Sequence, residues 1–359
     1  MERILSLFLV LITVSTSYAQ HDFDSLYKNN DHFKKFITSY AKDYDIFNNE
    51  SPLEMTLKSD FKNLIKRKYK DEYQGAILEY NLNDTVLVRR EVKIKARGEF
   101  RRKKCMNPPL KINFKKKDVL LPQLREFDKM KMVDVCKNND LYEQYLITEF
   151  LVYKMYNLLT EFSFRVRLLN VNYVDLSGKY KPRTRYAFFI EDIDQLAFRH
   201  DAIRYQMERI SPKSTDQEIT GILDVFQYMI GNTDYYIPME HNIKMIKIND
   251  VTKPRPIVIP YDFDYAGIIN AMYAVPGELW PIEDVKERYY MGNCQTEERY
   301  SEIVEIFREK KNDLYNLVEG SPYLKEKTRK YIIRYIDQFY DMVDKPNVLE
   351  RRLLNNCKK

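Results

Sequence analysis

The hydrophobic pattern changes its period near the middle of the chain, and this change constrains the fold more than any single motif. From residue 75 to residue 190, short strand-like runs surround one amphipathic segment of helical spacing, Leu141 to Leu159. After a polar link at residues 191–194 the pattern becomes mainly helical. The expected strands cover Ala76–Tyr80, Val86–Lys95, Leu110–Phe114, Met130–Val135, Arg165–Val174 and Tyr186–Ile190. This order predicts an α+β chain with a strand-rich first part, which holds one long helix, and a mainly helical second part.

The residues before these strands have a different pattern. Between residues 20 and 74 the chain is charged, and its apolar residues Phe33, Ile37 and Tyr40 recur at helical spacing. We therefore expect a helical leader that packs against the main body.

Residues 1–19 have the order of a secretory signal peptide. Arg3 precedes the apolar run Ile4 to Val14, and the small residues Ser17 and Ala19 follow it. We expect cleavage after Ala19 and an exported protein that is periplasmic or secreted. The apolar run is too short to span a bilayer, and no other stretch approaches the required length, so no stable membrane span is expected.

The net charge does not call for a nucleic-acid partner. A formal charge of +6 is spread over 359 residues, a length sufficient for two lobes. No nucleic acid is therefore expected among the partners.

The four cysteines lack the close paired spacings of a zinc site. They are Cys105, Cys136, Cys294 and Cys357. In an exported chain, disulfides are the favoured interpretation, with buried free thiols as the alternative. Cys105 with Cys136 is the preferred pair, because each lies beside a strand of the same expected sheet.

Polar side chains gather at turns between residues 231 and 267. Asp234 lies in a loop, Asn242 opens an apolar run, and Asp262 closely follows a second apolar run. A hairpin made of these two runs would bring the three side chains to one point. An Asp and an Asn from neighbouring strand ends suit a magnesium ion that also binds nucleotide phosphates. The alternative is that these short polar residues form ordinary turns.

Several ordered motifs together resemble the CotH family, the spore-coat protein H-like atypical protein kinases, in its exported bacterial form. The resemblance covers residues 75 to 295 and rests on Lys95–Gly98 with Pro108–Lys111, Phe189–Asp192, Gly231–Asp234 with His241–Asn242, and Tyr261–Asp264 with Gly267. It implies a two-lobed protein-kinase-like fold with an upper lobe at residues 75–191 and a lower lobe at 192–359. It also implies magnesium, ATP, and transfer of the γ-phosphoryl group to a hydroxyl of an unidentified protein substrate.

The resemblance assigns roles to the three residues of the 231–267 segment. Asp262 matches the aspartate that holds magnesium between the phosphates, and Asn242 matches the asparagine on a second metal ion. Asp234 matches the aspartate that orients or deprotonates the acceptor hydroxyl.

The resemblance also assigns residues to the nucleotide. Lys111 is the candidate for the strand lysine that steadies the phosphates, and Arg97 assists it. Glu191, in the hinge-like segment, is assigned to cofactor binding. Either Glu143 or Glu149 on the long helix would complete an ion pair with Lys111.

Three departures from the kinase pattern weaken the assignment of the base more than that of the metal ligands. The chain has no glycine-rich phosphate loop, seven residues rather than four separate Asp234 from Asn242, and no glycine directly follows Phe263.

Two other functions stay open. A non-catalytic binding or envelope-structural module would keep the frame without turnover, as the scarcity of ATP outside the cytoplasm would favour. A metal-dependent phosphodiesterase using Asp234, Asp262 and Asp264 is weaker, because the four histidines are scattered along the chain.

Overall fold

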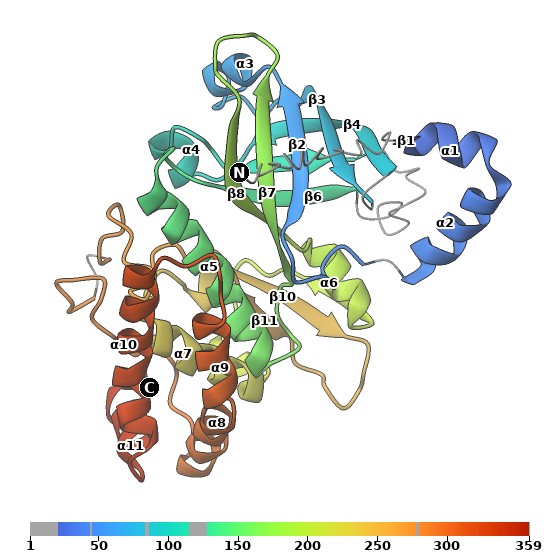
Figure 1. The fold of residues 1–359 in the computed structure, drawn as a ribbon. Helices are drawn as coiled ribbons and strands as arrows, with labels where there is room; N and C mark the ends of the chain where they lie inside the picture. Colours follow the sequence, from blue (N-terminus) through green and yellow to red (C-terminus); the bar gives the residue numbers. More distant parts are fainter. Residues whose placement is uncertain (1–20, 44, 83–85, 115–127, 278–279, 359) are drawn as a thin grey trace, which may run out of the picture.

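The computed structural model describes residues 21–43, 45–82, 86–114, 128–277 and 280–358. The predicted signal peptide lies outside these residues. Within them, a β-barrel stands against a helical body that contains a small second sheet (Figure 1).

Seven strands form the barrel in the order β4-β3-β2-β7-β8-β6-β5, and a pairing of β5 with β4 closes it. Neighbouring strands are antiparallel, except that β2 and β7 run parallel. The strands are β2 (Leu53–Ser59), β3 (Gln74–Asn81), β4 (Val86–Ala96), β5 (Leu110–Asn113), β6 (Lys129–Asp134), β7 (Val166–Asp175) and β8 (Arg183–Ile190). Alternation along β4 places Val88, Val92 and Ile94 in the buried interior cluster.

The closed barrel corrects the predicted fold class. A two-lobed protein-kinase-like fold with a strand-rich upper lobe was expected, and the strands instead close into a ring. The strand that completes the ring is β2, whose residues Leu53–Ser59 pair with Leu169–Asp175 of β7. These residues lie in the segment expected to be a helical leader, so that expectation is wrong for β2. Closure satisfies the backbone groups that a sheet edge would leave unpaired.

Strands β6, β7 and β8 are buried on both faces. Met132, Leu169 and Phe189 belong to the barrel interior, whereas their neighbours Leu168 and Phe188 belong to the cluster of the helical body. This double burial explains why these strands are almost continuously apolar in sequence. One apolar cluster therefore crosses the expected boundary at residue 191, and the predicted domain limits remain predictions.

Two helices follow the first short strand in the N-terminal segment. Strand β1 (His21–Asp22) pairs with the start of β4, and α1 (Phe23–Asn29) and α2 (Asp31–Asp43) follow it. Phe23 and Ile37 are fully buried against the barrel cluster. A third short helix, α3 (Phe61–Lys66), lies over one end of the barrel (Figure 1).

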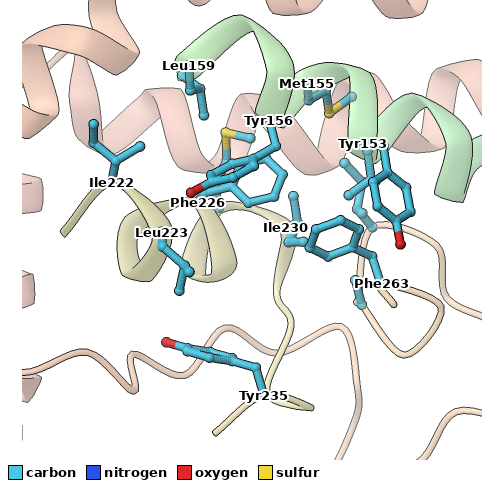
Figure 2. Packing of buried hydrophobic residues seen from close by; sticks show 14 of the residues in the cluster. Tyr153, Met155, Tyr156, Leu159, Ile222, Leu223, Phe226, Ile230, Tyr235 and Phe263 are labelled. Carbon is cyan, nitrogen blue, oxygen red and sulfur yellow. The ribbon is translucent and has the colours of Figure 1, made fainter. Parts of the chain in front are cut away.

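The long helix α5 (Asp140–Leu159) lies between the barrel and the other helices (Figure 1). Figure 2 shows Tyr153 and Tyr156 of α5 facing Phe263 and Phe226, and in each pair the ring centroids are 4.8 Å apart. The body also contains α4 (Phe100–Lys104), α6 (Ile193–Arg199), η2 (Pro212–Ser214), α7 (Gln217–Ile230), η3 (Ile237–Met239), α8 (Glu297–Glu309), α9 (Lys311–Glu319), α10 (Glu326–Val343) and α11 (Val348–Asn356). Among the described residues, no helix combines the length and apolar character needed to cross a membrane.

The expected hairpin of the second half is confirmed. Strand β10 (Ile243–Ile248) pairs antiparallel with β11 (Ile257–Pro260), and β9 (Ala202–Tyr205) adds an unexpected third strand.

Two disulfides join the four cysteines. Cys105 is bonded to Cys136, as expected, and Cys294 is bonded to Cys357.

Candidate functional site

The loop that carries Asp234 begins where α7 ends. Gly231 caps the helix with a left-handed φ of 66°, and a Cβ there would lie 1.9 Å from the Tyr335 hydroxyl. Only glycine therefore suits this position. The buried Asn232 then accepts a hydrogen bond from the Asp234 backbone N–H at 3.0 Å, while its amide donates to Gln227. The side chain of Asn232, itself bonded to Gln227, thus fixes the backbone of Asp234.

Three of the site residues meet directly. Asp234 Oδ1 lies 2.8 Å from His241 Nε2, and Asp234 Oδ2 accepts a hydrogen bond from Asn242 Nδ2 at 3.0 Å. The same amide also donates to the Asp234 carbonyl at 2.7 Å. The hydrogen bond that Asp234 accepts from His241 raises the pKa of His241, which favours the imidazolium as donor. Because the Asn242 nitrogen is committed to Asp234, its side-chain oxygen is the atom left for a cation.

Asp262 directly follows Tyr261, the residue after β11, and has a left-handed φ of 63°. Its backbone N–H donates to the Tyr153 hydroxyl at 2.8 Å, and Phe263 anchors the next position in the core of Figure 2. The Asp262 side chain is half-buried. Within the described part of the chain its carboxylate has neither an ion pair nor a hydrogen bond in the structure. The backbone of Asp262 is therefore fixed, while its carboxylate is available to bind a cation.

Asp264, two residues further, is buried under Arg101. Their closest charged atoms are 3.9 Å apart, and Tyr273 donates a hydrogen bond to Asp264 Oδ2 at 3.0 Å. Burial, and then the charge of Asp262, raise the pKa of Asp264 to about 7. A committed, buried acid of this kind does not suit the third carboxylate of a hydrolase.

The expected ion pair between the long helix and Lys111 is wrong. Glu149 is buried and pairs with Arg101 at 3.3 Å, while Glu143 is 3.5 Å from Arg185. Burial raises the pKa of Glu149 well above its usual range, although Arg101 opposes the shift. No sequence pattern singled out Arg101, which belongs to the basic run Arg101–Lys104 and lies four residues before Cys105.

Lys111 and Arg97 line one cavity of about 420 Å³. Lys95, Lys111 and Lys131 occupy paired positions on β4, β5 and β6, so their side chains lie in one row. Gly98 turns the chain beside them with a φ of 79°. Burial lowers the pKa of Lys111, which is half-buried. We call this the basic cavity.

Lys131 was missed by the motif comparison and is the most enclosed cation of the basic cavity. Burial, and then the charge of Arg97, lower its pKa to about 8. Its ammonium group lies 5.2 Å from the ring centre of Tyr261, the residue before Asp262. A single lysine inside the apolar run from Met130 to Val135 was the available signal.

The carboxylate of Glu191 contacts two arginines that do not line the basic cavity. It is 0% exposed, and its carboxylate oxygens lie 2.7 Å from Arg165 and 3.1 Å from Arg199. This arrangement gives its side chain a structural role. The assignment of Glu191 to cofactor binding stays a prediction.

The residues present suit a magnesium ion that arrives with phosphates. Across the described ranges, no group of three or more His, Cys, Asp and Glu side chains is arranged to hold a metal. Asp262 and the Asn242 oxygen supply two hard donors, and magnesium in nucleotide sites takes one or two protein carboxylates plus phosphate oxygens. The basic cavity supplies the cations that phosphates require.

No family model matches the chain, and no curated protein matches it. Among solved structures, the chain is similar to a crystal structure of the Helicobacter pylori proinflammatory kinase CtkA, with 9% sequence identity and a TM-score of 0.37. That match covers 79% of this chain and 92% of the other. Likeness at this level carries no argument about fold or activity, so membership of the CotH family stays a prediction.

Proposed function

We propose that this protein is an exported, magnesium-dependent phosphotransferase that moves the γ-phosphoryl group of ATP to a hydroxyl of a protein substrate. Lys131, Lys111 and Arg97 hold the phosphates, and Asp262 with Asn242 holds the metal. Asp234 serves the acceptor hydroxyl.

One observation carries the proposal: Tyr261 lies beside a lysine of the basic cavity and directly precedes Asp262. Its ring faces the Lys131 ammonium group at 5.2 Å, and the next residue is the uncommitted Asp262. The charges of Asp262 and Arg97 both act on the Tyr261 hydroxyl, with opposite effects on its pKa after the larger effect of burial. A phosphate chain with a bound cation fits between groups of these two signs.

The proposed transfer needs a group that receives one proton. The acceptor oxygen forms a bond to the γ-phosphorus as the bond from that phosphorus to the ADP oxygen breaks. The hydroxyl proton passes to Asp234, whose two oxygens are held in place by His241 and Asn242. Bound magnesium would neutralise charge on the phosphate oxygens during this step.

The competing function is a non-catalytic binding module. One observation favours it: both oxygens of Asp234 already have hydrogen-bond partners, His241 and Asn242, so neither is free to accept the proton of a substrate hydroxyl. Such a module would bind ATP or another anion without turnover.

Export fits the covalent structure. Two disulfides persist best in an oxidising compartment, and the sequence carries the order of a signal peptide. A periplasmic or secreted location is therefore part of the proposal.

The test compares Asp262→Asn, Asp234→Asn and the wild type. Asp262→Asn is expected to abolish phosphate transfer, because the metal loses its charged ligand, and Asp234→Asn is expected to lose transfer but retain ATP binding. Phosphate incorporation by intact mass and calorimetric titration of magnesium and ATP measure the two properties. Asp250→Asn, in the exposed turn between β10 and β11, is the matched control.

Three outcomes separate the functions. A wild type that binds ATP without transfer supports the binding module. A wild type that binds no nucleotide, or an Asp262→Asn variant that transfers phosphate normally, rules out the phosphotransferase.

A further inference from the structure

A second cavity, of about 400 Å³, lies at one end of the barrel. Its lining includes the first residues of β5 and β8, Leu110 and Arg183, and the last residues of β6 and β7, Asp134 and Asp175. These four positions mark the same open end of the ring, over which α3 lies (Figure 1). We call this space the barrel-end cavity.

The walls of the barrel-end cavity are mainly apolar. Phe61 and Leu64 of α3 face it, together with Leu110 and Tyr173 from the barrel interior. At its rim, Met106 is 49% exposed and Tyr180 is 43% exposed, so apolar surface continues outward to solvent. Mouths of barrels with this volume and lining are common positions for small-molecule sites.

The two acids in the lining are already engaged. Asp175 accepts hydrogen bonds from the backbone N–H groups of Phe61, Lys179 and Tyr180, at 2.9 to 3.0 Å. Asp134, which is 2% exposed, accepts one from Val135 and lies 3.8 Å from Arg183. Neither acid therefore has a strong need for a cationic ligand.

The three cations in the lining differ in how far they are paired. Lys181 is exposed and has no ion-pair partner in the described part of the chain. Arg185 pairs with Asp140 at 3.4 Å and with Glu143 at 3.5 Å, so it is engaged on the protein side. Arg183 donates to the Asn107 side-chain oxygen at 2.7 Å and lies 3.8 Å from Asp134, but its buried Nε atom has no hydrogen-bond partner among the described residues. An apolar space with cations at its edge suits a ligand with an apolar body and one anionic head.

We propose that the barrel-end cavity is a binding site for an amphipathic carboxylate, with the apolar body inside the barrel end and the head group beside Lys181 and Arg183. This site is separate from the basic cavity: on β5, Leu110 lines one and Lys111 lines the other. The proposal does not depend on ATP binding or phosphate transfer.

Calorimetric titration of the oxidised protein with two probes of equal chain length tests the site. Decanoate is expected to bind at one site per chain, and decyltrimethylammonium at least tenfold more weakly, because the rim carries cations. Leu64→Trp should abolish decanoate binding, because the larger side chain fills the cavity. The melting transition of this variant is measured separately to check that it folds.

A matched pair of lysine variants tests the role of charge. Lys181 lines the cavity, and Lys179, exposed in the same β7–β8 turn, does not. Lys181→Glu should weaken decanoate binding at least threefold, and Lys179→Glu should leave it unchanged. If Leu64→Trp does not fold, this pair still decides the question.

Each contrary result overturns the proposal. They are the absence of saturable decanoate binding, equal affinity for the two head groups, and equal effects of the two lysine variants.

Discussion

Lys131 is half-buried, and burial lowers its pKa from 10.5 to about 8. The folded protein therefore binds fewer protons than the unfolded chain between these two values. Below pH 8, where Lys131 stays charged in the folded protein, its burial lowers the unfolding free energy. This destabilising contribution disappears as the pH rises above 10. A bound phosphate would compensate this charge.

Replacing Lys131 by methionine separates ligand binding from stability. Lys131→Met keeps most of the side-chain volume and removes the buried charge, so ATP affinity should fall more than tenfold, about 1.4 kcal/mol, while the melting temperature does not fall. Titration calorimetry and melting curves at pH 7 measure both properties.

Two further lysine variants calibrate that result. Lys111→Ala should weaken ATP binding by a smaller factor, because burial lowers the pKa of Lys111 less than that of Lys131. Lys129→Met, on the same strand but outside the lining of the basic cavity, should have no effect. Unchanged affinity in Lys131→Met would remove this residue from the phosphate site.

Asp224 is a buried acid beneath the Asp234 loop. It is 1% exposed, and the Tyr235 hydroxyl donates to it at 3.0 Å. Burial raises its pKa from 3.8 to about 7. Because the folded pKa is the higher one, the stabilising contribution is complete below about pH 4 and is lost as the pH rises through 7.

We therefore expect Asp224→Asn to flatten the pH dependence of stability. Between pH 5 and pH 8 the wild type should lose at most about 3 kcal/mol of unfolding free energy through this residue, because the loss ends once the pH passes 7, and the variant should not. Urea unfolding at the two pH values measures the difference. Asp250→Asn, at an exposed turn, is the control and should follow the wild type.

At the scale of elements, α4 is a short helix that places Arg101 between Glu149 and Asp264. A helix of five residues is not stable alone. Its end is fixed by the Cys105–Cys136 disulfide and by the hydrogen bond from the Met106 N–H to the Cys136 carbonyl at 3.0 Å. The disulfide thus helps to hold Arg101 beside the two buried acids Glu149 and Asp264.

Removing each disulfide separately tests this support. Cys105→Ala with Cys136→Ala should lower the unfolding free energy by about 2–4 kcal/mol and also weaken magnesium–ATP binding, because Arg101 is no longer held. Cys294→Ala with Cys357→Ala should lower stability by a similar amount and leave the affinity within about twofold. Equal affinities in the two double variants would contradict the link from α4 to the site.

At the scale of the whole molecule, the barrel wall is also one wall of the body core. Alternate residues of β7 and β8 face the two clusters, so the sheet and the helices share side-chain contacts along α5. A substitution that alters side-chain packing in one cluster is therefore expected to alter packing in the other.

Processing of the N-terminus is a prediction for the whole chain. Expressed with residues 1–19 in a host that exports it, the mature protein should begin at Gln20 and contain both disulfides. Amino-terminal sequencing and non-reducing peptide mapping check this. A chain that keeps Met1 and free thiols would contradict export.

Local pattern was sufficient for features that depend on near neighbours in the sequence. The β10–β11 hairpin, the long helix α5 and the turns carrying Asp234 and Asp262 follow from apolar period and from glycine and asparagine at turns. Their determinants lie within a few residues of one another. The Cys105–Cys136 bond likewise follows from two strands expected in one sheet.

Closure of the barrel and the partners of the buried charges depended on contacts between distant residues. Pairing of β2 with β7 joins residues more than a hundred positions apart, and Arg101 reaches Glu149 rather than leaving that acid to Lys111. Sequence spacing specifies which face a side chain occupies on its own element, but not which charge it meets across the core. Burial, which moves the pKa of Lys131 and Asp224, is likewise set only when the barrel and the helices pack together.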